Sequence, residues 1–205
     1  MTKLFLILML GFSPLVFAKK AVPDLFAAAE SGDLATLKNH KSALKEKNSA
    51  GESLLIKAVS AGQMETAKWL IRNGADVNEA DLSGGTALLY AVSGGEEELA
   101  LLLIEKGADL EKTYGERKES VVFEAVRLGQ NKVLEKILTK SPKLAQGANT
   151  EGETALFEAV RSAQSKSAQI LLKKGADKAV RNKKGRKAVD LADPKTDSAL
   201  IQILN

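Results

Sequence analysis

The feature that most constrains the fold is a period of 33 or 34 residues that runs along the chain. An alanine followed by a valine returns at this interval, and a small residue stands four positions after each alanine. The pairs are Ala58-Val59, Ala91-Val92, Ala125-Val126 and Ala159-Val160, and the small residues are Gly62, Gly95, Gly129 and Ala163. A fixed period of this length indicates one structural unit stacked on copies of itself, so the sequence predicts a repeat array.

Each unit contains short helices. The apolar residues of 65–71 and 98–104 return at i, i+3 and i+4, the spacing of an amphipathic helix. A second marker, Gly-Ala-Asp, follows the same period at 74–76, 107–109 and 175–177, and its glycine suits a helix end because φ > 0 costs least without a Cβ. Aromatic residues make up only 4% of the chain, which favours many closely packed small helices over a β-sandwich.

These residues resemble the ankyrin repeat. The best matches are the stretches 84–91 (GGTALLYA) and 152–159 (GETALFEA), and several copies keep one register along the chain. The resemblance implies an all-α ankyrin-repeat solenoid of about five repeats with a C-terminal half-repeat as a cap. We place the repeats at about 22–48, 49–80, 81–112, 113–148 and 149–180, and the cap at 181–205. The repeats and the cap together form one domain, residues 19–205.

Two departures from the family pattern stand out. The fourth repeat replaces Gly-Ala-Asp with the segment 141–144 (SPKL), and its turn at 115–118 lacks a glycine at the expected place. The histidine of the family's Thr-Pro-Leu-His opening, which normally ties adjacent loops by hydrogen bonds, is apolar in every copy. The residues at its position are Ile56, Leu89, Phe123 and Phe157. Apolar packing therefore has to substitute for that histidine.

The first 18 residues have the pattern of a signal peptide. Lys3 precedes an uncharged apolar stretch, Leu4 to Val16, that is short for a membrane span, and Ala18 offers a cleavage site. The alternative is a membrane anchor that stays attached. The chain has no cysteine, which excludes disulfides and a cysteine-linked lipid anchor. We therefore expect cleavage after about Ala18 and a periplasmic protein that is monomeric when free; full secretion is the second choice.

The sequence favours a binding protein over an enzyme. His40 is the only histidine, in a polar stretch where we expect it to be exposed near a helix end, favoured by the helix dipole. Without cysteine or a histidine pair we expect no metal, and since the glycines mark repeat turns we expect no phosphate loop and no cofactor. The net charge of +4, one unit less without Lys3, is too small to indicate a nucleic-acid partner.

The resemblance implies that the first helices and the hairpin tips form a concave surface, where we expect a partner protein to bind. The candidate contact residues are Lys57, Leu82, Tyr90, Glu116, Arg117, Glu124, Arg127, Leu128, Glu158 and Arg161. Tyr90, Arg127 and Arg161 are the expected anchors, because Tyr and Arg are favoured at the energetic centres of interfaces. The alternative is that the charges only keep this face soluble. A basic cluster, Arg181 to Lys187, is either a solvated end or an attraction for an acidic partner or the anionic envelope.

The resemblance extends to small exported bacterial ankyrin proteins, some of which are immunity proteins that inhibit peptidoglycan peptidases. It implies a periplasmic module that sequesters an envelope enzyme, such as a peptidoglycan endopeptidase or carboxypeptidase, for self-protection. Two alternatives remain open. One is a scaffold or chaperone-like adaptor that does not inhibit, and the other is a secreted effector.

Overall fold

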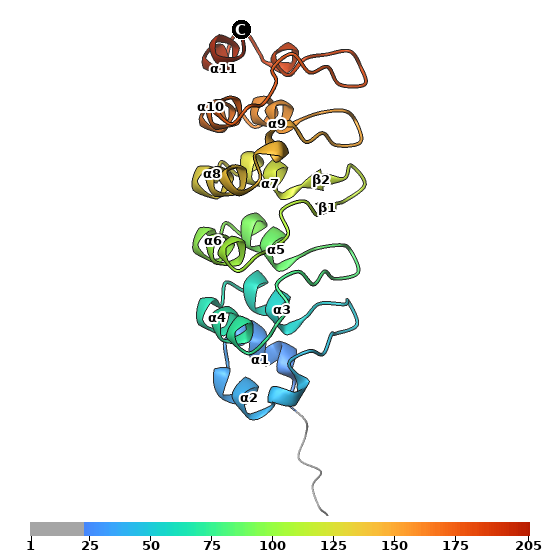
Figure 1. Ribbon diagram of the computed structural model, residues 1–205, viewed down its shortest axis with the longest axis vertical. Helices are drawn as coiled ribbons and strands as arrows, with labels where there is room; N and C mark the ends of the chain where they lie inside the picture. The colour runs from blue at the N-terminus through green and yellow to red at the C-terminus, as the bar shows by residue number, and fades with distance from the viewer. Residues whose placement is uncertain (1–22) are drawn as a thin grey trace, which may run out of the picture.

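The chain forms an elongated stack of helix pairs. The computed structural model describes residues 23–205, and the expected signal peptide lies outside the described residues. Eleven α-helices, three 3₁₀-helices and one two-stranded β-hairpin follow one another along the described range, with the C-terminus at one end of the stack (Figure 1). This arrangement confirms the predicted all-α solenoid.

The helices lie in two columns. The first helices of the five repeats are α1 (Leu25–Ser31), α3 (Leu54–Ser60), α5 (Ala87–Ser93), α7 (Val121–Arg127) and α9 (Ala155–Arg161). The second helices are α2 (Leu34–Asn39), α4 (Met64–Arg72), α6 (Glu97–Glu105), α8 (Asn131–Lys140) and α10 (Ser165–Lys173). Two 3₁₀-helices, η1 (Lys41–Ala43) and η2 (Pro142–Gln146), follow α2 and α8, and the cap consists of η3 (Ala188–Leu191) and α11 (Ser198–Leu204). Figure 1 shows the second helices stacked in one column beside the first.

The repeated alanine explains why the first helices stack so closely. Ala58, Ala91, Ala125 and Ala159 are all fully buried. A methyl group is the smallest side chain that still favours a helix, so it lets neighbouring helices approach without leaving a cavity. The side chains of Ser53 and Thr86 cap α3 and α5 by accepting the backbone N–H groups of Ile56 and Leu89, at 3.3 and 3.2 Å.

An extended hairpin precedes every first helix from the second repeat onward, and we call these hairpins the fingers. The fingers of repeats 2, 3 and 5 are closed by the antiparallel bridges Lys47–Ser53, Ala80–Thr86 and Ala148–Thr154. The finger of repeat 4 contains β1 (Thr113–Tyr114) and β2 (Glu119–Ser120), with Tyr114 opposite Glu119. The cap finger comprises residues 181–187. All fingers project from the same side of the stack (Figure 1).

The fourth repeat is irregular at both predicted places. Helix α8 is the longest of the second helices, and the chain continues from it into η2 instead of the usual glycine turn. In the finger, Lys118 has φ of 52°, at the place where the neighbouring fingers have Gly84 and Gly152. A left-handed backbone costs an ordinary L-residue about 1–2 kcal/mol, so this finger carries local strain.

Apolar side chains do replace the family's histidine in packing. Ile56, Phe123 and Phe157 are buried, and Leu89 is half-buried. Trp69 is half-buried against the same core, at a position that other repeats fill with leucine or isoleucine. Within residues 23–205, the helices are all too short or too polar to cross a membrane.

Candidate protein-binding surface

Four of the five fingers, those of repeats 2, 3 and 5 and of the cap, owe their shape to one polar side chain in the turn. Asn149 Oδ1 accepts the backbone N–H groups of Glu151 and Glu153, at 2.9 and 3.1 Å. Asn182 Oδ1 does the same for Lys184 and Arg186 in the cap finger, at 3.0 and 3.1 Å. Asn48 and Asp81 hold the fingers of repeats 2 and 3 in the same way. Such a side chain imitates a backbone turn and fixes the loop.

Neighbouring fingers are also bonded to one another. Backbone hydrogen bonds join Leu82 N to Ala50 O at 3.0 Å, Thr150 N to Arg117 O at 2.8 Å and Lys183 N to Glu151 O at 2.9 Å. The amide groups of Asn149 and Asn182 donate to Glu119 and Glu153 on the preceding fingers, at 3.2 and 2.9 Å. These bonds tie adjacent loops, the role that the family's histidine normally has.

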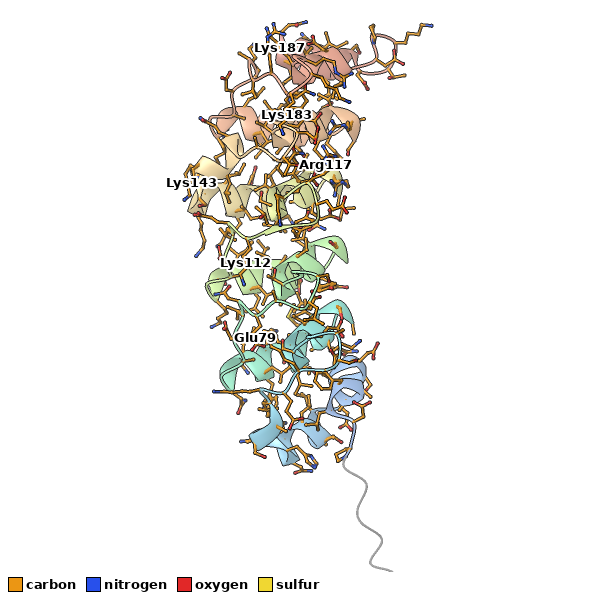
Figure 2. The ribbon with its side chains drawn as sticks, turned by 90° about the vertical axis from the view of Figure 1, so that its right-hand side faces the viewer. Glu79, Lys112, Arg117, Lys143, Lys183 and Lys187 are labelled. Atoms are coloured by element: carbon orange, nitrogen blue, oxygen red, sulfur yellow. The ribbon has the colours of Figure 1, made fainter. Side chains whose placement is uncertain are left out.

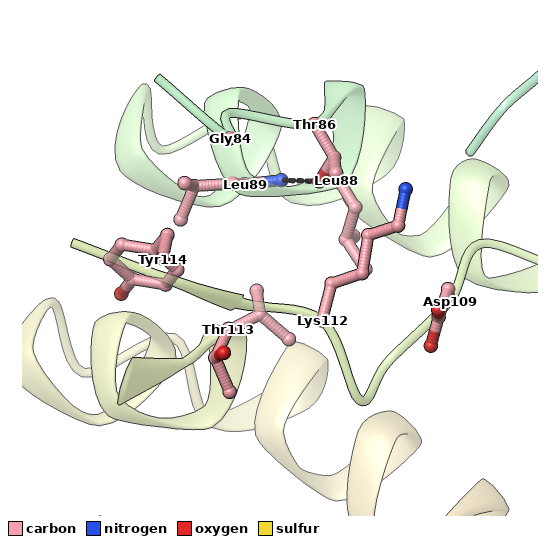
Figure 3. Close-up of a pocket in the computed structure, with 9 residues that line it drawn as sticks. Gly84, Thr86, Leu88, Leu89, Asp109, Lys112, Thr113 and Tyr114 are labelled. Carbon is pink, nitrogen blue, oxygen red and sulfur yellow. Dashed lines mark hydrogen bonds between the residues drawn. The ribbon is translucent and has the colours of Figure 1, made fainter. Parts of the chain in front are cut away.

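The row of fingers is interrupted between repeats 3 and 4. Across the part of the chain that the structure describes, no backbone hydrogen bond joins these two fingers. Gly115 stands where other fingers have Asn or Asp, and Tyr114 stands where the fingers of repeats 3 and 5 have an alanine. The ring of Tyr114 lies in a cleft beside Leu89 (Figure 3), with a free volume of about 10 Å³, room for about one water molecule.

Tyr114 is the residue of this surface that sequence reasoning missed. Aligning the repeats would have shown a tyrosine at an alanine position, next to a missing asparagine. Burial raises the pKa of its hydroxyl, and the charge of Glu124, 3.5 Å away, raises that pKa further.

Beyond this interruption, charged side chains of repeats 4 and 5 form a connected Glu–Arg network. Its members are Arg117, Arg127, Arg161, Glu119, Glu124, Glu153 and Glu158. Arg127 lies at its centre and binds three carboxylates: Glu119 at 2.9 Å, Glu158 at 2.8 Å, and Glu124 one helical turn away. Burial opposes the charge of Arg127, but the bonds to Glu158 and Glu119 outweigh it and raise the pKa of the guanidinium.

Glu153 is the second centre of the network. Its carboxylate accepts Arg117 at 2.6 Å, Arg161 at 2.5 Å and the amide of Asn182 at 2.9 Å. Burial alone would raise the pKa of Glu153, but these three bonds more than offset it and lower that pKa. Each of the four carboxylates contacts at least one of the three guanidinium groups, and the network keeps one negative charge in excess.

The expected anchors in this half are therefore engaged within the chain. Arg127 and Arg161 remain about one-third exposed, yet each binds at least two carboxylates. We expected Glu158 to be exposed, but it is buried, because both arginines bind it across the face of α9. The glutamates at 124 and 158 thus share one cation instead of facing solvent separately.

The N-terminal half of the surface is less charged. Tyr90 is half-buried, and its hydroxyl donates to Asp81 at 2.5 Å. Burial favours a higher pKa for Asp81, but the bonds from Tyr90 and Ser83 outweigh it and lower that pKa. The same bond to Asp81 raises the pKa of Tyr90. Lys57 lies 3.7 Å from Glu30.

Three of the expected contact residues are openly accessible. Leu82 is 82% exposed at the tip of the repeat 3 finger, and Leu128 is 45% exposed at the end of α7. Glu116 is exposed at the tip of the repeat 4 finger. Leu82 and Leu128 are the only large hydrophobic side chains of residues 23–205 that are this exposed. An exposed leucine at a fingertip is available to a partner, because nothing in its own array covers it.

The exposure of His40 differs from the sequence prediction. Its Nδ1 lies 2.8 Å from the carbonyl of Thr36, so the ring folds back on α2 and is half-buried instead of exposed. Over residues 23–205, no cluster of His, Cys, Asp and Glu has the size needed to hold a metal ion.

Comparison with known families decides the classification. A model of ankyrin repeats in three copies matches residues 25–114, and a single ankyrin-repeat model matches residues 151–183. Together they cover more than half of the chain. The chain belongs to the ankyrin-repeat family. The two ankyrin models do not match residues 115–150. In this region Gly115 replaces the usual Asn or Asp of the finger, Lys118 replaces its glycine, and residues 141–144 replace Gly-Ala-Asp.

Three solved structures are similar over 88–89% of the chain, each with a TM-score of 0.79. One is the immunity protein solved in complex with a predatory endopeptidase from Bdellovibrio bacteriovorus, with 32% identity over 88% of this chain and 95% of that one. An ankyrin repeat domain from Acinetobacter baumannii has 25% identity over 88% and 95%. A further ankyrin repeat protein has 26% identity over 89% and 96%. None of the curated proteins compared with the chain matches it in sequence.

Proposed function

We propose that this ankyrin-repeat protein is an exported immunity protein that binds and silences a peptidoglycan endopeptidase or carboxypeptidase, and so protects the cell that makes it. The observation that carries the proposal is the similarity to an immunity protein solved in complex with a predatory endopeptidase, at 32% identity and a TM-score of 0.79. Function does not follow from the fold alone, but this likeness also extends to sequence over 88% of the chain.

The geometry of the surface supports a protein partner over a small molecule. The cleft of Figure 3 has room for only about one water molecule, and a larger hollow beside Leu44 and Glu79, about 250 Å³, is still smaller than the roughly 300–1,000 Å³ usual for ligand pockets. Except between repeats 3 and 4, hydrogen bonds hold neighbouring fingers to one another, so binding would cost little ordering entropy. The exposed Leu82 at a fingertip offers an apolar contact to a protein partner.

The periplasmic location is part of the proposal and has its own test. The expected signal peptide predicts that the chain is recovered from the periplasmic fraction, with an N-terminus near Lys19. Fractionation followed by mass spectrometry of the N-terminus measures both. Recovery of the uncleaved chain in the cytoplasm would contradict this part.

Inhibition is tested by mixing the purified protein with a purified peptidoglycan endopeptidase and following release of muropeptides. We expect activity to fall in proportion to added protein until about one equivalent is present. Leu82→Asp should weaken inhibition, because it places a charge on an exposed fingertip. Gln169→Asp adds the same charge to exposed α10 in the other column and should leave inhibition unchanged. Full activity at saturating protein would refute inhibition, and a stable complex with full activity would favour the scaffold alternative.

A further inference from the structure

The cap finger, residues 181–187, has an unusual concentration of positive charge. It carries five cations and no carboxylate: Arg181, Lys183, Lys184, Arg186 and Lys187. Within residues 23–205, none of the five forms an ion pair. The arginines of repeats 4 and 5 differ sharply, since each binds two or three carboxylates.

These charges are held on a rigid turn. Asn182 is buried, and its side chain accepts the N–H groups of Lys184 and Arg186 while donating to Glu153. Lys183 N donates to the carbonyl of Glu151 on the preceding finger. Crowding like charges on a fixed turn is unfavourable in the free protein, and an anion placed against them relieves that repulsion. Because the backbone is already ordered, little entropy is lost when an anion binds.

The pattern along the fingertips restricts the kind of anion. Lys183 and Lys187 lie at the C-terminal end of the finger face (Figure 2). The next finger inward carries exposed Glu151, and the one after it carries exposed Glu116 together with exposed Lys118. An extended anionic surface such as a membrane would meet these carboxylates as well as the cations. A short acidic segment needs to contact only the cap finger.

We propose that the cap finger is an electrostatic docking site for a short acidic segment of a partner protein. The proposal rests on the proposed function only in that the partner is a protein; it does not require that the partner is a peptidase or is inhibited. The cap finger attracts the acidic segment. Leu82 lies on the repeat 3 finger of the same row, nearer the N-terminal end, where it is open to an apolar contact. Electrostatic contacts of this kind mainly raise the association rate and fix orientation.

The test uses a short dye-labelled oligoglutamate peptide and the purified protein. Fluorescence anisotropy is measured at low ionic strength and at about 0.15 M salt, where exposed charges are more strongly screened. We expect binding that weakens with salt, and none to an oligoglutamine peptide of equal length. The triple variant Lys183→Ser/Lys184→Ser/Arg186→Ser should bind about tenfold more weakly, since each exposed pair contributes about a factor of two.

A matched control removes three cations at the opposite end of the stack, Lys38→Ser/Lys41→Ser/Lys45→Ser, all exposed. Its affinity should stay within about twofold of the wild type, since these cations lie far from the cap finger compared with the Debye length. Equal losses in the two triple variants would overturn the proposal, because net charge alone would then explain binding. Absence of peptide binding by the wild type, or binding to anionic phosphatidylglycerol vesicles without peptide binding, would also overturn it.

A single charge reversal provides a second test of the cap finger. Lys184→Glu alone reverses one exposed charge without removing any backbone bond and should weaken peptide binding as well; an unchanged affinity would count against the cap finger. The assay contains no peptidase, so its failure is distinct from failure of the inhibition experiment.

Discussion

Replacing Arg127 with methionine should destabilise the protein by about 2–3 kcal/mol. The side chain keeps most of its length and loses its charge. Breaking a buried ion pair by removing one partner costs about 3–5 kcal/mol, because a charge is left buried without compensation. Arg127 is 36% exposed, so water screens part of this interaction and the cost must be discounted.

The magnitude depends on what each carboxylate keeps. Glu119 retains Asn149 at 3.2 Å and Arg117 at 3.4 Å, and Glu158 retains Arg161 at 3.6 Å. Glu124, which is 14% exposed, loses its only arginine and keeps only the hydroxyl of Tyr114 at 3.5 Å. Most of the loss should therefore come from Glu124. Adding Glu124→Gln to the variant should recover about 1 kcal/mol, a coupling typical of residues in direct contact.

Urea unfolding measures the effect with two probes. Circular dichroism follows helix over the array, while the fluorescence of Trp69, the only tryptophan, reports on repeat 2. If the array unfolds as one unit, the two transitions coincide in the wild type and shift together in the variant. If repeats unfold partly independently, the circular dichroism transition shifts more than the fluorescence transition, because the network lies in repeats 4 and 5.

The control is Lys132→Met, which breaks an exposed pair with Glu97 at 2.8 Å. An exposed pair of this kind contributes about 0.2–1 kcal/mol. A loss for Arg127→Met no larger than that for Lys132→Met would refute the reasoning, since the network would then be worth no more than a surface contact.

Three further predictions concern other contacts of the array. Lys118→Gly and Ala163→Gly should each raise the free energy of unfolding by about 0.5–1 kcal/mol. Glycine removes the strain of a positive φ, and this gain is larger than the free-energy cost of the greater entropy that glycine gives the unfolded chain. Unchanged urea midpoints would argue against strain. Tyr90→Phe should lower the free energy of unfolding by about 1–2 kcal/mol, because buried Asp81 loses a hydrogen bond. A decrease in this free energy smaller than the error of the urea titration would contradict the prediction. The lowered pKa of Glu153 means that its charge stabilises the fold above the unfolded pKa of about 4.3 and that this contribution disappears as the pH falls through the lower folded value. Glu153→Gln should therefore reduce the dependence of the urea midpoint on pH below neutrality, and parallel profiles of variant and wild type would show the sign or the assignment to be wrong.

The fold was predictable because its signals are local and repeated. The alanine of each first helix marks a place where backbones meet, and the structure buries all four. The spacing of apolar residues and glycines predicted two short helices per repeat and an irregular end of the second helix in repeat 4. Each of these features depends on neighbours within one repeat or on the same position in the next, and both can be read from a periodic sequence.

The binding surface was only partly predictable. The sequence indicated that Arg127, Arg161 and the glutamates of repeats 4 and 5 lie on one face. It did not indicate that Arg127 binds Glu119 and Glu158, which are 8 and 31 residues away, or that Arg161 shares Glu153 with Arg117. Periodicity determines which residues occupy equivalent positions in neighbouring repeats. Because several carboxylates then lie within reach of each arginine, the period alone does not determine which ion pairs form.

By itself the sequence determined the period, the helices and the single cysteine-free array. The tertiary structure alone decided which charges are satisfied within the chain and which stay available. It closed the Glu–Arg network in repeats 4 and 5, separated the fingers at Tyr114, and left Leu82 and the cap finger open to solvent. The physical reason is that ion pairing and exposure depend on distances between side chains of different repeats, and only the stacking of those repeats sets these distances.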